Sequence, residues 1–320
     1  MEIARIHTLM KTVKSNVQQV IVGKDDVIDK LLVALIAGGH VLLEDVPGTG
    51  KTLLVKALAR SIDGTSKRVQ FTPDLLPSDL SGINMYNQKS GEFEFRAGPI
   101  FTNLLLADEI NRATPRTQSS LLECMEEQQV SIDGVTLPLQ QPFMVLATQN
   151  PLDNYGTFPL PEAQLDRFML KLKLGYPSHE EGLSILERFR TGQPLEELHP
   201  VASTEEIILA QKHYTDVYVD RSILEYVLHI VEGTRKHHDV ALGASPRASQ
   251  ALLRAVQAYA VVQGRSFVTP DDVKELVIPV LGHRLLFNQP AQQRDKQVEQ
   301  VLTQVLGQVP VPAEQSAVEI

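Results

Sequence analysis

Between residues 41 and 52 the sequence combines the residue types that hold a phosphate group. A short apolar run, Val41 to Glu44, leads into Asp45-Val46-Pro47-Gly48-Thr49-Gly50-Lys51-Thr52 and then into an apolar helical pattern. This is the layout of a phosphate-binding loop between a strand and a helix. Gly48 and Gly50 let the backbone turn its N–H groups toward an anion at a helix N-terminus, where the helix dipole favours negative charge. Lys51 would contact the phosphate, and the Thr52 hydroxyl would contact Mg²⁺.

The loop departs from the consensus G-x-x-x-x-G-K-[ST] at one position, because Asp45 stands where the first glycine is expected. Gly-Lys-Thr alone also occurs by chance in many chains of this length. The alternative is therefore an ordinary glycine-rich turn between a strand and a helix. A lysine in the first turn of a helix is slightly unfavourable, and a bound phosphate would remove that misfit at Lys51.

Two further apolar runs end in polar residues that suit phosphate chemistry. Leu104 to Ala107 is followed by Asp108 and Glu109, and Phe143 to Thr148 is followed shortly by Asn150. In an open parallel sheet the carboxyl ends of the strands lie at the crevice where ligands bind. There Asp108 can hold the Mg²⁺ shell, Glu109 can polarise a water, and Asn150 can orient that water. The alternatives are a plain strand exit at the acidic pair and an Asn-Pro turn after the second run.

Apolar periodicity predicts the elements that position these residues. Helical spacing covers 3–22, 25–37, 51–62 and 115–128, and short apolar runs predict strands at 41–43, 68–72, 104–107 and 143–148. Such alternation predicts an α/β fold with a doubly wound, mostly parallel sheet. Turn residues within 83–95 and within 130–137 predict two hairpin inserts.

After Gly175-Tyr176-Pro177 the pattern becomes helical, with N-cap signals at Ser203, Asp220, Ser245 and Thr269. We therefore expect two domains. The first, residues 1–177, is the α/β core with its N-terminal helices. The second, residues 178–320, is all-α and ends in an apolar helix near 297–306 and a short polar tail.

Composition excludes several classes of protein. Thirty Lys and Arg against 39 Asp and Glu give a net charge of −9, which opposes a strongly basic nucleic-acid binder. The longest apolar run, 31–37, is far shorter than the roughly 20 residues of a membrane helix, and Glu2, Arg5 and Lys11 interrupt any signal-peptide core. We expect a cytoplasmic protein without membrane insertion. The single cysteine, Cys124, is expected to be buried and inert, and His237-His238 to be a solvated helix end.

Longer phrases resemble the MoxR family of AAA+ ATPases. They are Pro-Gly-Thr-Gly-Lys-Thr (47–52), Leu-Ala-Asp-Glu-Ile-Asn-Arg-Ala (106–113), Ala-Thr-Gln-Asn-Pro (147–151) and Pro-Leu-Pro-Glu-Ala-Gln-Leu-Asp-Arg-Phe (159–168). The resemblance is close over 21–177, looser over the helical part to 288, and absent in the tail. It implies a P-loop AAA+ core with helix-2 and pre-sensor-1 hairpin inserts, followed by an all-α lid domain. It also makes an aspartate at position 45 unsurprising.

The resemblance further implies Mg²⁺-dependent ATP hydrolysis and a role for each matching residue. Asp108 and Glu109 would be the Walker B pair, Asn150 the first sensor, Arg167 an arginine finger for the neighbouring subunit, and Arg247 the second sensor. Lys51 would act with them, and Thr52 and Asp108 would hold the metal. The expected nucleotide-binding residues are Ile21, Val22, Gly23, Pro47, Gly48, Thr49, Gly50, Lys51, Thr52 and Leu53.

The two arginines keep alternative explanations. Arg167 follows Asp166, so an intrachain salt bridge competes with the finger role. Arg247 occupies the second position of a predicted helix, where the dipole disfavours a cation, so it is either an anion partner or a solvated side chain. Arg112 and Arg116 are further candidates for reaching across a subunit interface.

At the level of assembly the resemblance implies a homo-oligomer, a hexameric ring, with a chaperone-like task in remodelling or maturing a partner complex. That partner would be a client or a protein with a von Willebrand factor A domain. A nucleic-acid motor is one alternative, which the acidic charge opposes; the predicted hairpin tips offer only Lys89 and Asp133. A nucleotide-dependent switch without motor activity is the other.

Overall fold

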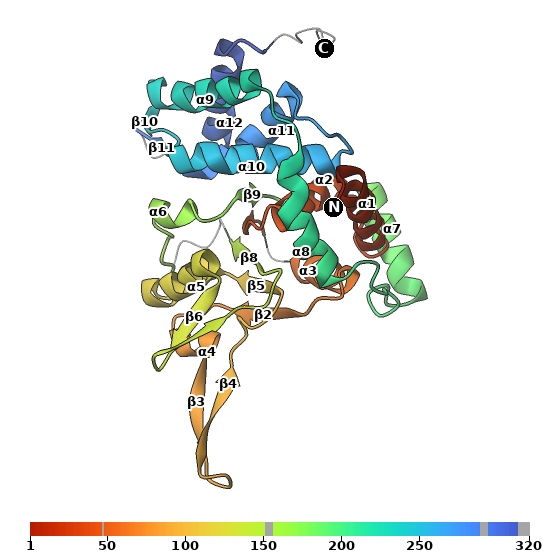
Figure 1. Ribbon diagram of the computed structural model, residues 1–320, viewed down its shortest axis with the longest axis vertical. Coiled ribbons are helices and arrows are strands. Elements are labelled where there is room, and N and C mark those ends of the chain that lie inside the picture. The colour runs from red at the N-terminus through yellow and green to blue at the C-terminus, as the bar shows by residue number, and fades with distance from the viewer. Residues whose placement is uncertain (47, 151–155, 289–293, 313–320) are drawn as a thin grey trace. The chain divides into compact units, whose positions relative to one another are not determined.

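The computed structural model describes residues 1–46, 48–150, 156–288 and 294–312 (Figure 1). Two compact units are present: one comprises Met1 and Thr8–Lys212, and the other Glu2–His7 with His213–Ile320. Each unit has its own core. The sheet lies wholly in the first unit, and the predicted functional division at residue 177 stays a prediction.

A five-stranded sheet forms the centre of the first unit. Its strands are β1 (Val41–Glu44), β2 (Ser66–Gln70), β5 (Leu104–Asp108), β8 (Met144–Gln149) and β9 (Leu170–Leu172). All are parallel, in the order β2-β5-β8-β1-β9. The central strands are almost completely buried, as their unbroken apolar runs predict. The predicted α/β class with a parallel sheet is thereby confirmed.

Helices cover the sheet and extend the unit. They are α2 (Asp25–Ile36), α3 (Lys51–Ser61), α4 (Pro77–Ser81), α5 (Pro115–Glu127), α6 (Glu162–Leu165), α7 (His179–Thr191) and α8 (Thr204–His213), with the short 3-10 helix η1 (Ile110–Arg112). The helix α1 (Ile3–Gln18) belongs to both units, because its first residues, up to His7, are part of the second. On α1 the predicted apolar face is buried, with Ile6, Met10, Val13 and Val17 fully inside. Burial of that face stabilises a helix that would be marginal alone.

Both predicted inserts are antiparallel hairpins. The first pairs β3 (Gly82–Asn87) with β4 (Glu92–Ala97), and Figure 1 shows it extending away from the sheet. The second pairs β6 (Gln129–Ile132) with β7 (Val135–Pro138) through a turn in which Asp133 and Gly134 both have positive φ. An Asp-Gly pair suits that turn because both positions require the left-handed region. Asn84 Nδ2 donates to Asp133 Oδ2 at 2.7 Å and so joins the two hairpins.

The second unit is helical, as predicted, with one small addition. Its main helices are α9 (Arg221–Lys236), α10 (Pro246–Val262), α11 (Pro270–Leu281) and α12 (Arg294–Gln308), joined by the 3-10 helices η2 (Tyr214–Asp216) and η3 (Gly282–Arg284). A two-stranded ribbon of β10 (Val240–Leu242) and β11 (Leu286–Phe287) was not expected. These strands are too short to give a periodic signal in the sequence.

The predicted N-caps can be checked one by one. Ser203 Oγ, Asp220 Oδ1 and Ser245 Oγ each accept a backbone N–H from the first turn of the helix that follows. Thr269, the fourth, occupies the N-cap position of α11, and its backbone N–H donates to Asp272 Oδ2 at 2.8 Å. The starts of α8, α9 and α10 are therefore fixed by local sequence.

Other isolated residues lie as the sequence indicates. Cys124 is buried in α5, and burial raises the pKa of its thiol to about 11, so the thiolate is scarce at neutral pH. His237 follows the end of α9, stacks on His238 and bonds Gln304 Oε1 through Nε2 at 2.9 Å. None of the helices in the described part of the chain combines the length and apolar character needed to cross a bilayer.

An ion pair with a buried carboxylate, Asp272, lies at the start of α11 in the second unit. Asp272 is 3% exposed, receives the Arg265 guanidinium with Nη1 at 2.6 Å from Oδ2, and also accepts the Thr269 N–H at 2.8 Å. We expect Asp272→Ala to lower the free energy of unfolding by about 1–3 kcal/mol, because it removes the carboxylate shared by the Arg265 guanidinium and the Thr269 N–H. Denaturant unfolding measures this. Asp271→Ala is the control, since the exposed Asp271–Lys274 pair contributes less than about 1 kcal/mol; equal losses would contradict the assignment.

Candidate active site

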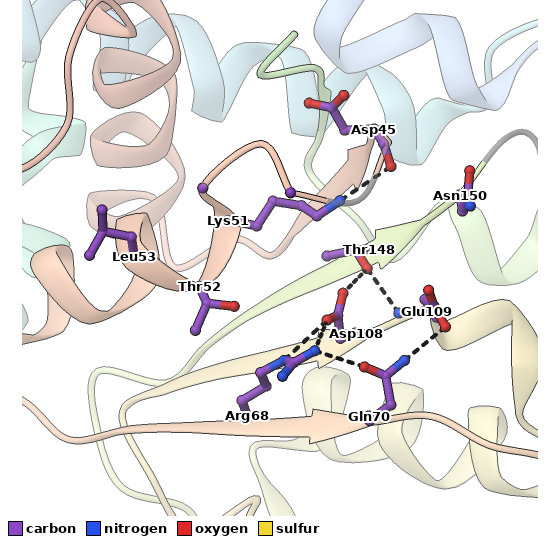
Figure 2. A pocket seen from close by; sticks show the side chains of 12 residues that line it. Asp45, Lys51, Thr52, Leu53, Arg68, Gln70, Asp108, Glu109, Thr148 and Asn150 are labelled. Atoms are coloured by element: carbon purple, nitrogen blue, oxygen red, sulfur yellow. Dashed lines mark hydrogen bonds and ion pairs between the residues drawn. The ribbon is translucent and has the colours of Figure 1, made fainter. Parts of the chain in front are cut away.

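The carboxyl ends of the parallel strands open into one cleft of about 400 Å³. Side chains from the loop before α3 and from the ends of β2, β5 and β8 point into it (Figure 2). The lining residues are Asp45, Gly48, Gly50, Lys51, Thr52, Leu53, Arg68, Gln70, Asp108, Glu109, Thr148 and Asn150. The three sequence segments that suggested phosphate chemistry therefore meet at a single place.

The loop between β1 and α3 has the conformation that its glycines allow. Gly48 and Gly50 adopt φ of +85° and +92°, in the left-handed region, and α3 begins directly after them at Lys51. Lys51 is buried and its Nζ donates to the carbonyl oxygens of Asp45 at 3.2 Å and Val46 at 3.0 Å. The helix N-terminus and the ammonium group thus face the same cleft, an arrangement suited to an anion.

Asp108, the last residue of β5, is held from two sides. Thr148 Oγ1 donates to Oδ1 at 2.6 Å, and Arg68 contacts Oδ2 through Nη2 at 2.6 Å and Nε at 3.1 Å. Thr148 is 1% exposed, so its hydroxyl is fixed by packing. Because β5 and β8 are hydrogen-bonded neighbours, this bond joins the ends of two adjacent buried strands.

Glu109 leaves the strand in a left-handed conformation with φ of +57°. Its backbone N–H donates to Thr148 Oγ1 at 2.8 Å. Its Oε2 accepts Gln70 Nε2 at 2.8 Å and lies 3.2 Å from Arg112 Nε. The two neighbouring carboxylates consequently take different partners, although one hydroxyl, that of Thr148, contacts both residues (Figure 2).

Three residues of this network were missed in the sequence: Arg68, Gln70 and Thr148. Arg68 and Gln70 are two apart on β2, so they share a face, and the pairing places Gln70 opposite Asp108. The sequence did contain a signal, because polar and apolar residues alternate along the predicted strand 68–72. The polar residues belong to the site only because β2 lies beside β5, and periodicity does not predict the order of strands in a sheet.

Several predicted residues lie elsewhere. Ile21, Val22 and Gly23 follow α1 and are not among the residues that line the cleft, and Thr49 bonds the Val46 carbonyl at 3.3 Å. Pro47 lies outside the described residues. Arg167 Nη1 donates to the Leu122 carbonyl at 2.6 Å and pairs with Glu126 at 3.1 Å.

Arg247 belongs to the second unit. It is the second residue of α10, whose first turn is capped by Ser245. That position confirms the helix start that the sequence predicted. The role of Arg247 toward the cleft stays a prediction.

The donor set fits a magnesium ion. Thr52 and Asp108 line the same cleft and offer hydroxyl and carboxylate oxygens, the hard ligands that Mg²⁺ takes together with phosphate oxygens. The cationic groups of Lys51 and Arg68 lie in the same lining, so a polyanion would also be balanced there.

Comparison with known proteins shows which family this chain resembles. The family model "ATPase family associated with various cellular activities (AAA)" matches residues 40–170, and "AAA lid domain" matches residues 232–305. The chain is 50% identical to the uncharacterized protein YeaC of Bacillus subtilis over 98% of both chains. It is 43% identical to Chaperone MoxR1 of Mycobacterium tuberculosis, over 97% of this chain and 84% of that one.

The fold has a solved counterpart. A crystal structure of a candidate ATPase from Cytophaga hutchinsonii superposes with a TM-score of 0.89 at 38% identity, over 97% of this chain and 96% of that chain. The α/β core, the helical lid domain and the sequence identity over nearly the whole chain all indicate the same family. The protein is therefore a member of the MoxR family of AAA+ ATPases.

Proposed function

We propose that the protein binds ATP and Mg²⁺ in the cleft at the strand ends and hydrolyses the terminal phosphoanhydride bond. The observation that carries this is the convergence of Lys51, Asp108, Glu109 and Asn150 on one cleft from three separate segments of the chain. Membership of an ATPase family supports the activity.

We assign the roles of the individual residues from their positions in the cleft. The loop N–H groups and Lys51 bind the β- and γ-phosphates, and Thr52 and Asp108 hold the metal. Mg²⁺, when bound, neutralises phosphate charge. Glu109 accepts a proton from a water whose oxygen attacks the γ-phosphorus, and the bond from that phosphorus to the bridging oxygen breaks. ADP and inorganic phosphate leave, and the proton passes from Glu109 to solvent. Asn150 orients that water, and Ile21, Val22 and Gly23 line the adenine.

We further propose that the active form is a hexameric ring. Arg167 follows α6, donates to the Leu122 carbonyl of α5 and is not among the residues lining its own cleft, which suits an arginine supplied to a neighbouring subunit. Arg247, at the start of α10, would sense the γ-phosphate from the lid. Arg112 and Arg116 remain further candidates for the interface; Arg112, like Arg167, contacts a carboxylate of its own chain, that of Glu109.

The proposed task of this machine is chaperone-like remodelling or maturation of a partner complex in the cytoplasm. A relative at 43% identity is named Chaperone MoxR1, which supports the task. The partner would be a client or a protein with a von Willebrand factor A domain. The net charge of −9 opposes a nucleic-acid track.

Glu109→Gln tests the role of the carboxylate. We expect binding of a non-hydrolysable ATP analogue within about threefold of the parent, because the glutamine keeps the shape and a Gln70 contact. Turnover should fall by about 10²–10⁴, since a neutral amide cannot polarise the water. Calorimetric titration and phosphate release measure the two effects. Undiminished turnover would exclude Glu109 as the base.

Thr148→Val tests the shared hydroxyl. The change leaves an Asp108 oxygen and the Glu109 N–H without their common partner, at a cost of about 1–3 kcal/mol for each buried group. We expect kcat to fall about tenfold to hundredfold, with a smaller change in KM. Thr148→Ser retains the hydroxyl, so its kcat should stay near that of the parent. If kcat falls as far in the serine variant as in the valine variant, then packing, and not the hydrogen bonds, is responsible.

Arg167→Ala tests the arginine finger. We expect assembly to persist and turnover to fall by about 10³ or more, because a trans arginine stabilises transition-state charge. Glu126→Gln is the matched control, since it removes the charge of the intrachain partner and leaves Arg167 in place. Mixing Arg167→Ala with Glu109→Gln subunits should restore part of the turnover at sites where an intact Glu109 meets an intact Arg167. A mixture as inactive as its components would argue against action in trans.

A further inference from the structure

Asp45, the residue that breaks the phosphate-loop consensus, makes hydrogen bonds that no phosphate role requires. Its side chain is buried, and Oδ2 accepts the backbone N–H groups of Leu174 and Gly175, each at 2.9 Å. Oδ1 accepts the N–H of Val46 at 2.8 Å. All three donors are backbone groups, so the carboxylate connects two stretches of main chain.

These two stretches are far apart in sequence. Asp45 begins the loop that leads to Lys51, while Leu174 and Gly175 follow β9 and precede α7. Gly175 adopts φ of +64°, a conformation that glycine takes without strain. The carboxylate therefore fastens the start of the phosphate loop to the segment by which the chain leaves the sheet, here called the exit segment, Leu174–Gly175.

The main chain of Asp45 continues this connection into the cleft. Its carbonyl oxygen accepts Lys51 Nζ at 3.2 Å, and its N–H donates to the carbonyl of Gln149 at the end of β8 at 3.2 Å. In Figure 2 the carboxylate points away from Asp108 and Glu109. One residue thus contacts the phosphate-binding lysine with its backbone and the exit segment with its side chain.

A carboxylate in this position opposes anion binding, because a negative charge beside a polyanion is unfavourable. Glycine would satisfy the consensus without that cost, but it would leave the N–H groups of Leu174 and Gly175 without this partner. The preceding residue has a similar role. Glu44 pairs with Lys171 of β9 at 2.6 Å, and both side chains are less than one fifth exposed. Two consecutive acidic residues at the end of β1 are used to hold β9 and the exit segment.

We propose that Asp45 is a positioning residue of the ATPase site, whose carboxylate makes the phosphate loop and the exit segment move together. Phosphate binding that shifts the loop is then transmitted to the start of α7. This inference rests on the proposed function for its nucleotide dependence, but the tether itself is a property of the chain alone.

Asp45→Gly is the decisive variant, because it completes the consensus G-x-x-x-x-G-K-T while deleting the tether. Amide hydrogen exchange, resolved by fragmentation, is measured at Leu174 and Gly175 with and without a non-hydrolysable ATP analogue and Mg²⁺. We expect at least tenfold faster exchange at both amides in the variant. The analogue should alter exchange there in the parent but not in Asp45→Gly, although the variant binds the analogue within about threefold of the parent's affinity. Asp45→Asn keeps one acceptor oxygen, so its exchange rates at Leu174 and Gly175 should lie between those of the parent and those of Asp45→Gly.

Asp63→Gly is the control, since it exchanges an exposed aspartate at positive φ for glycine in the same unit and should leave both amides unchanged. Unchanged exchange at Leu174 and Gly175 in Asp45→Gly would overturn the tether. So would equal acceleration along all the strands, which would indicate general destabilisation. A parent that binds the analogue without any change at these amides would overturn the coupling. A parent that binds no analogue would refute the proposed function, and the comparison without nucleotide would still decide the tether.

Discussion

The hydrogen bond from Thr148 to Asp108 is the interaction on which the geometry of the site depends. Parallel pairing brings the carboxyl ends of β5 and β8 to one edge, and the buried hydroxyl of Thr148 then fixes both Asp108 and the backbone of Glu109. Apolar packing of the two strands holds the hydroxyl in place. The positions of the polar side chains at the carboxyl ends of β5 and β8 therefore depend on the burial of the apolar residues within these two strands.

Charge balance around this bond gives the two acidic residues different tasks. Asp108 shares one oxygen with Arg68, while Glu109 is held by Gln70 and Arg112. Arg68 and Gln70 also bond each other, Nη2 to Oε1, at 2.8 Å. The edge strand β2 thus supplies an ordered row of polar groups that keeps adjacent carboxylates apart. Removing either acidic residue would leave donors on β2 without a partner, so the effects of changes within this row should not be additive.

The sequence predicted the parts of the fold that local rules determine. Buried strands have unbroken apolar runs, and the starts of α8, α9 and α10 carry their capping side chains. It did not predict β9, because three residues are too few for periodicity, nor the pairing of β2 with β5. The contribution of Arg68 and Gln70 to the site follows from that pairing and was missed for the same reason. Strand order arises from packing between distant segments, which no local pattern encodes.

Asp45 shows how a departure from a consensus can carry structural information. The consensus has a glycine there. Here three backbone N–H groups fix the aspartate instead, and the loop still reaches the left-handed turns at Gly48 and Gly50. The negative charge that this places near a phosphate site is held by N–H dipoles and points away from the acidic pair (Figure 2). The loop therefore gives up conformational freedom at its start and gains a fixed connection to the segment that follows β9.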